Sequence, residues 1–436
     1  MLASFSSAFD PSETSDSSLD PLGLYAFSDA LATRLIPGLR ERMSIPRFLT
    51  TIAFGAHVCE PFRGRVAKDG RSDPYQIYEW LMVTGWYKNH RNTKELLGLP
   101  GVQKAEEAFN QSKPLNAARY LKTASVFGFH GVYRTLAEDI GVVDEAYQLG
   151  PLGEDLIQAW ARGMGLSLAA PEWLQRVKSM QSDIDQSLKL GQVSVSRRSH
   201  RLSDVADFFL PRRITTEESE VIWEGLVRGE SLRGSFADFM TKEGGALWNA
   251  SLEQSRVGNE RNVYAAFQQS LHNAAGRTSI QLIRDYERTA STLHEAFHAI
   301  LRRLELASPV SVEELVALPE VSQGATRIAE EWRAVCVAWD DWGRSHDVTG
   351  LALPEGLQDV LEVRSPVQFI EMLWLHHSRI QKKKGRQGKM RWLERDDHGR
   401  FHVSLRGRSE EPSPGSFVHA YRCAPMLSFI QSMQRG

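Results

Sequence analysis

Cysteine is scarce in this chain. The 436 residues include only Cys59, Cys336 and Cys423, which lie far apart and form no C-x-x-C pair. Disulfide-stabilised secreted domains and cysteine-rich zinc sites need closely spaced cysteines in larger number. We therefore expect neither kind of site, and a reducing compartment, the cytoplasm, as the location of the protein.

Long apolar runs are also missing. A membrane-spanning helix needs roughly 18 consecutive apolar residues, and the sequence contains no such stretch. Residues 1–20 lack the positive start and the apolar core of a secretory signal, and their many serines and aspartates predict a disordered polar leader. We expect no membrane partner.

The common nucleotide and hydrolase motifs do not occur either. The chain has no G-x-x-x-x-G-K-[ST] loop, no G-x-G-x-x-G after a strand and no G-x-S-x-G elbow. If the protein works in an ATP-driven process, a partner must supply the motor. The formal net charge of -2 gives no overall attraction to nucleic acid, so any basic surface has to be local.

Helical periodicity is the strongest positive signal. Residues 279–306 carry apolar side chains at alternating spacings of three and four, which predicts one long packed helix. These positions are Ile283, Tyr286, Ala290, Leu293, Phe297, Ile300 and Leu304. Similar patterns elsewhere predict a mainly α, multi-helical fold, with an N-terminal domain at 21–190, a linker at 191–203 and a C-terminal domain at 204–436. The aromatic cluster at 75–87 is expected to be core.

The same long helix contains the sequence His294-Glu295-Ala296-Phe297-His298, which matches H-E-x-x-H. Two histidines four residues apart present two nitrogens to one Zn²⁺, and Glu295 could deprotonate a bound water. Glu330 and Glu331, on the next long helix, are the candidates for the third ligand, and Glu331 is the one we select. A zinc metallopeptidase is therefore one interpretation. The alternative is a structural helix without a cofactor, because Leu293 and Phe297 hold the centre of the apolar stripe.

Residues 113–160 resemble a winged-helix domain. We predict a helix at Leu115–Phe127, a turn at Gly128, a second helix at Val132–Ile140, a small β-ribbon at 142–149 and a helix from Pro151. In a DNA reader, His130 and Arg134 on the second helix would enter the major groove. Acidic residues outnumber basic ones here, however, so a protein-docking or architectural role is the alternative.

A basic segment lies near the C-terminus, in the run IQKKKGRQGKMRW. Its candidate phosphate contacts are Lys382, Lys383, Lys384, Arg386, Lys389 and Arg391. The residues that follow predict a β-hairpin, so that 379–408 would form a basic hairpin. The alternative is a solvated loop with no ligand.

The C-terminal order of HHSRIQKKKG, KMRWLE and HAYRCAPMLSFIQSM resembles uncharacterised bacterial defence-island proteins that are encoded beside helicases and phospholipase-D-like nucleases. This resemblance implies a non-catalytic scaffold or DNA-engaging subunit of a multi-protein anti-phage complex, with a helicase or nuclease as partner. A zinc metallopeptidase and a protein-interaction module without nucleic acid are the other two hypotheses.

Overall fold

The chain folds into two compact units in the computed structural model. Unit 1 comprises Met1–Leu35 and Phe239–Cys423, and unit 2 comprises Ile36–Asp238 and Ala424–Gly436. The structure describes residues 20–91, 93–121, 128–195, 205–228, 232–255, 259–347, 350–384, 389–405 and 416–434. The predicted leader, apart from Asp20, and most of the predicted linker lie outside these residues.

The division into units differs from the predicted domains. Residues 188–193 belong to unit 2, because the Lys68 amide donates to the Leu188 carbonyl (2.9 Å) and Leu115 pairs with Val193 in an antiparallel bridge. These bonds between residues far apart in the chain tie the start of the predicted linker to the interior of the unit. Sequence periodicity carries no signal for such pairings.

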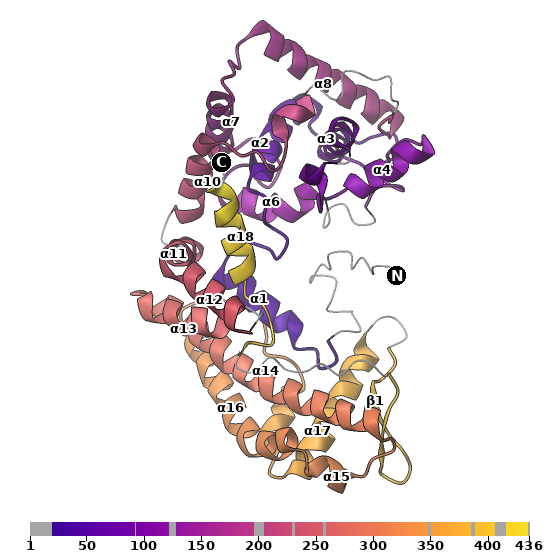
Figure 1. Cartoon of the computed structure of the whole chain (residues 1–436), viewed down its shortest axis with the longest axis vertical. Helices are drawn as coiled ribbons and strands as arrows, with labels where there is room; N and C mark the ends of the chain where they lie inside the picture. Colours follow the sequence, from indigo (N-terminus) through magenta and orange to yellow (C-terminus); the bar gives the residue numbers. More distant parts are fainter. Residues whose placement is uncertain are drawn as a thin grey trace. The chain divides into compact units, whose positions relative to one another are not determined.

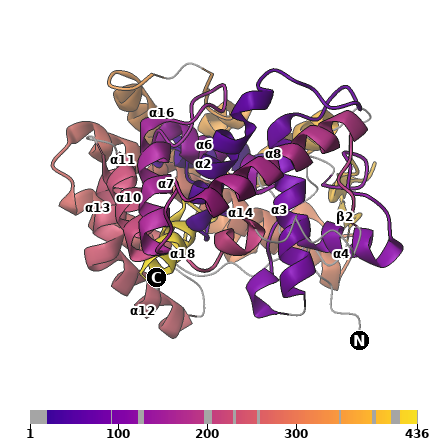
Figure 2. The same cartoon turned by 90° about the horizontal axis from the view of Figure 1, so that it is seen from above.

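Unit 2 is built around one central helix, α2 (Arg47–Cys59). Every residue of α2 except His57 is buried, and the helix contacts α3, α6, α7 and α8 (Figures 1 and 2). The α-helices around it are α3 (Pro74–His90), α4 (Val102–Gln111), α6 (Phe129–Asp139), α7 (Pro151–Gly163), α8 (Pro171–Leu190), α10 (Thr216–Val227) and most of α11 (Leu232–Phe239). Short 3-10 turns lie at Glu60–Phe62, Lys94–Leu96 and Asp207–Phe209. Nearly all of α18 (Cys423–Met433) also belongs to this unit.

The start of α3 shows why this aromatic stretch forms a helix. The Asp73 carboxylate accepts from the Gln76 amide, the Gln76 side chain bonds back to the Asp73 amide, and Pro74 occupies the first turn. Such a reciprocal cap satisfies backbone donors that a helix start leaves open. The predicted core role of the aromatic cluster is confirmed for Tyr78, Trp80 and Trp86, which are fully buried.

Unit 1 is dominated by α14 (Ala274–Leu306), which packs along α16 (Pro319–Gly343), and α16 in turn contacts α17 (Pro366–Lys383) (Figure 1). All seven predicted stripe positions of α14 are buried. The unit also contains α1 (Tyr25–Leu35), α12 (Gly245–Ser255), α13 (Glu260–Ser270), α15 (Val312–Val316), a π turn at Met240–Gly244 and a 3-10 helix at Leu357–Glu362. The long helix predicted from the sequence is thus the axis of this unit.

The predicted hairpin is present as β1 (Leu393–Arg395) and β2 (Phe401–Val403). The strands are antiparallel, with Leu393 opposite Val403, and Phe401 also exchanges backbone hydrogen bonds with Val310. The fold is therefore mainly α, with this hairpin as the sheet in the described part of the chain. No helix in that part has the length and apolarity to cross a membrane.

One predicted helix is wrong over the residues that the structure describes. Residues 115–121 of the expected Leu115–Phe127 helix are not helical, and 122–127 lie outside the described residues. The Asn116 side chain accepts from the amides of Ala118 and Arg119, a local bond that competes with helix formation. The expected ribbon at 142–149 is reduced to one bridge between Val143 and Leu149.

Candidate functional site

The two H-E-x-x-H histidines are neighbours on α14, and His294 is half-buried. The rings of His294 and His298 lie 4.1 Å apart between centroids, and His298 is almost fully buried. Burial lowers the pKa of His294 to about 4 and that of His298 to about 3, because the charged imidazolium is poorly solvated there. Both rings are therefore neutral at physiological pH, which is the form that binds metal.

Glu331, the predicted third ligand, lies on α16. Its contacts are on the Thr292 side of α14 and not on the side of the histidines. Its carboxylate pairs with Arg327 Nε (3.4 Å), and the same nitrogen donates to Thr292 Oγ1 (3.0 Å). Glu295 pairs with the same guanidinium, with 3.3 Å between Arg327 Nη2 and Glu295 Oε2. Thr292 and His294 are about 160° apart around an α-helix, which turns 100° per residue. Glu331 and the histidines therefore do not converge.

A zinc centre at His294 and His298 requires a third ligand from the protein. In the described ranges, no third histidine, cysteine, aspartate or glutamate converges with another two in a way that could hold a metal ion. A catalytic zinc needs three protein ligands and an open position. Glu295, the predicted general base, is engaged by Arg327 instead. The zinc interpretation stays a prediction that metal analysis can test.

The face of α14 that carries His294 also binds residues 418–421, the segment before α18. Glu287, two turns before His294, is buried and accepts from the Val418 amide (2.7 Å), His419 Nδ1 (2.7 Å) and Tyr421 Oη (2.8 Å). The nearby carboxylate raises the pKa of His419 above its ordinary value although burial alone would lower it. Glu287 was not among the residues predicted from the sequence, because its partners at 418–421 lie far away in the chain.

The basic segment is held at both ends. His377, on α17, lies with Nδ1 2.9 Å from the Pro21 carbonyl oxygen, and its Nε2 accepts from the Trp392 amide (2.9 Å). The Lys389 amide donates to the Gln381 carbonyl (2.9 Å), and Gln381 Nε2 donates to Pro21 as well. The end of α17 and the start of the hairpin are thus fixed against the same stretch of chain.

The six predicted phosphate contacts divide into three groups. Lys384 is buried and donates to the Asp20 carbonyl, so it is not available to a phosphate. Arg386 lies outside the described residues. The remaining four are exposed, and we call them the anchored basic surface: Lys382, Lys383, Lys389 and Arg391. Lys383 forms an ion pair with Glu355 (2.5 Å), which solvent exposure makes weak.

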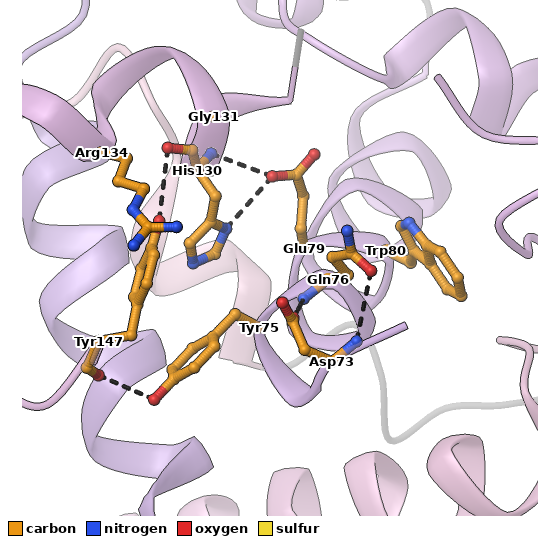
Figure 3. Close-up of a pocket in the computed structure, with 9 residues that line it drawn as sticks. All are labelled: Asp73, Tyr75, Gln76, Glu79, Trp80, His130, Gly131, Arg134 and Tyr147. Carbon is orange, nitrogen blue, oxygen red and sulfur yellow. Dashed lines mark hydrogen bonds and ion pairs between the residues drawn. The ribbon is translucent and has the colours of Figure 1, made fainter. Parts of the chain in front are cut away.

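His130 and Arg134 lie together in unit 2, at a small pocket of about 60 Å³ (Figure 3). His130 is only 7% exposed, and its Nδ1 is 3.2 Å from Glu79 Oε2. Arg134 Nε donates to Glu138 (2.6 Å), and the guanidinium lies over the Tyr147 ring. The His130 side chain is buried and is not placed to enter a DNA groove, whereas Arg134 is about half exposed and stays a predicted DNA contact.

Sequence analysis did not find Glu79, the partner of His130. The two residues are far apart in the chain, so no spacing rule relates them. A signal did exist: Glu79 stands between Tyr78 and Trp80 in a helix that is apolar on nearly every side, and a buried carboxylate requires hydrogen-bond donors.

No family model, curated protein or solved structure matches this chain.

Proposed function

We propose that the protein is a non-catalytic, DNA-engaging subunit of a multi-protein anti-phage complex, and that it contacts DNA through the anchored basic surface. A helicase or nuclease would be its partner, as the sequence resemblance implies. The observation that carries this proposal is the attachment of the basic segment at both ends by His377 and Gln381.

Anchoring matters because binding has an entropic cost. A free lysine-rich loop must become ordered on DNA, which opposes association. Here Lys382 closes the last turn of a helix, and Lys389 and Arg391 lie immediately before a strand whose neighbouring residue, Trp392, is held by His377. The cations are therefore presented near one another before any ligand arrives.

The surrounding ion pairs limit the surface. Arg379 pairs with Asp359 (2.5 Å), Arg395 with Glu371 (3.4 Å) and Arg400 with Asp396 (3.1 Å). The neighbouring carboxylates lower the net positive charge of this region, so the expected footprint on DNA is small. We expect binding that depends little on sequence and weakens steeply with salt, because the contacts are to phosphates.

The test is the DNA affinity of the purified chain, measured by fluorescence anisotropy on a duplex at several salt concentrations. A variant with Lys382→Gln, Lys383→Gln and Arg391→Gln should bind more weakly. Its slope of log affinity against log salt should shrink by about 0.9 for each lost phosphate contact. Unchanged affinity and slope would remove DNA binding from the proposal.

A matched control is Arg333→Gln, which neutralises an exposed cation on α16 in the same unit. It should leave both affinity and slope unchanged. The scaffold part is tested separately, by co-expressing the chain with the proteins of its neighbouring genes and measuring co-elution on a sizing column. Elution of the chain alone would contradict that part.

A further inference from the structure

The pocket at Glu79 and His130 has features that the DNA proposal does not use. It is lined by side chains of α3 and α6 and by Tyr147 from the turn after α6 (Figure 3). Its volume of about 60 Å³ is several times what one water molecule requires. It can therefore accept a small polar group.

The hydrogen bonds around Glu79 fix the tautomer of His130. Glu79 accepts from Tyr120 Oη (2.6 Å), from the His130 amide (3.0 Å) and from His130 Nδ1. A carboxylate in such a position only accepts, so Nδ1 carries the hydrogen and the neutral ring has its lone pair on Nε2. The carboxylate thereby prepares Nε2 as an acceptor.

The Nε2 acceptor of His130 is unsatisfied within the described part of the protein. Nε2 of His130 is buried and has no hydrogen-bond partner among the described residues. In Figure 3 it points away from Glu79, to the side where the rings of Tyr75 and Tyr147 lie. An unpartnered buried nitrogen is costly, which makes a donor from a ligand favourable at this position.

The charged side chains around the pocket determine which charge a ligand that donates to His130 Nε2 should carry. Arg134 pairs with Glu138, whereas Asp73 and Glu79 line the pocket without an ion pair to a lysine or arginine in the described residues. Burial, together with acidic neighbours that include Asp73, raises the pKa of Tyr75 to about 12. With two carboxylates and one guanidinium in its lining, the pocket carries a net negative charge, which disfavours an anion such as a DNA phosphate.

The walls suit a cation as well. The rings of Tyr75 and Tyr147 lie 4.5 Å apart between centroids, and Tyr75 Oη donates to the Tyr147 carbonyl (2.8 Å). Tyr147 has a φ of 61°, a left-handed conformation that is strained for an aromatic residue. Strained residues held by their surroundings are often found at binding sites. Aromatic faces attract ammonium and guanidinium groups, and the Arg134 guanidinium already lies over the Tyr147 ring.

We propose that this pocket binds a cationic N–H donor, an amine or a guanidine, whose hydrogen is accepted by His130 Nε2. The group is either a small free molecule or the end of a lysine or arginine side chain. Asp73 and Glu79 supply the compensating charge, and the tyrosine rings supply the walls. This inference does not rest on the DNA proposal.

The test is a titration of the full-length chain, ¹⁵N-labelled at histidine, followed by NMR of the imidazole nitrogens. The probes are N-methylguanidinium, methylammonium and, as the opposite charge, inorganic phosphate. We expect the two cations to shift the Nε2 resonance of His130 and phosphate to leave it in place. His57, which is exposed in the same unit, should not respond to any probe.

Two further arms complete the test. Short capped peptides with one central arginine or lysine should bind at lower concentration than the free probes if the source is a side chain, and no more tightly if it is a small molecule. Glu79→Gln should weaken cation binding at least several-fold, and His57→Gln should not change it. A shift with phosphate, or none with either cation at high millimolar concentration, would overturn the proposal.

Discussion

Glu287 and His419 form a buried ion pair across 2.7 Å, between the middle of α14 and the segment that precedes α18. The glutamate side chain is 1% exposed and the histidine side chain 8%. Two amides and the Tyr421 hydroxyl donate to the same carboxylate, so its charge is compensated by hydrogen bonds as well as by the imidazole.

We predict that Glu287→Gln destabilises unit 1 by about 3 kcal/mol, because removing one partner of a buried pair leaves the other without compensation. Urea unfolding followed by tryptophan fluorescence measures the change. Glu330→Gln, at an exposed position of α16, is the control and should stay within about 0.5 kcal/mol of the wild type. A loss as small as that of the control would contradict the role given to this pair.

The neutral histidines predict loss of stability in acid. The lowered pKa values of His294, His298 and His377 mean that the unfolded chain takes up protons first as the pH falls below about 6.5. Each of these histidines then lowers the free energy of unfolding by up to about 1.4 kcal/mol per pH unit, until the pH reaches its pKa in the folded protein. His419 acts in the opposite direction, because its raised pKa gives stability that is present below about pH 6.5 and lost as the pH rises through the raised value.

His298→Met should therefore flatten the dependence of the melting temperature on pH between 6.5 and 4. The exposed His272→Gln is the control, and its profile should follow that of the wild type. If His298→Met melts with the same slope as the wild type, the histidine is not held neutral in the folded protein.

We expect zinc in the purified protein well below one equivalent, because Glu331 and Glu295 bind Arg327 rather than a site at His294 and His298. Elemental analysis of protein dialysed against zinc measures this. One tightly held equivalent that disappears in His298→Ala would restore the metallopeptidase hypothesis.

A substitution at Gly128 tests where the Glu79 side chain lies. A Cβ at residue 128 would lie 2.1 Å from Glu79 Oε1, so Gly128→Ala must push the carboxylate out of its bonds with Tyr120 and His130. We expect a loss of about 2 kcal/mol, in the range for disturbing a buried polar group. In a Glu79→Ala background the same change should cost much less, and a double-mutant cycle measures that coupling. Additive effects would contradict the close contact.

The sequence predicted elements whose signal is local. The long helix at 279–306 and the hairpin near residue 400 are present because apolar spacing and a glycine turn act over short distances. The Leu115 helix was wrong partly because of the local Asn116 bonds and partly because Leu115 pairs with Val193, which periodicity cannot relate to it. The pocket was missed for the same reason, since His130 could be placed only as a residue of an exposed helix face until Glu79 was seen beside it.

The start of the described chain is held by residues that are synthesised much later. The carbonyls of Asp20, Pro21, Leu22 and Leu24 accept from Lys384, His377, His376 and Tyr286 respectively. Unit 2, in turn, includes the helix that ends at Met433, whose carbonyl accepts from Ser219. During translation neither unit can be completed from the residues that leave the ribosome first. Until α17 and α18 have been made, residues 20–22 lack their α17 partners and unit 2 lacks its last helix, so a ribosome stalled before residue 376 would display two incomplete units to chaperones and proteases.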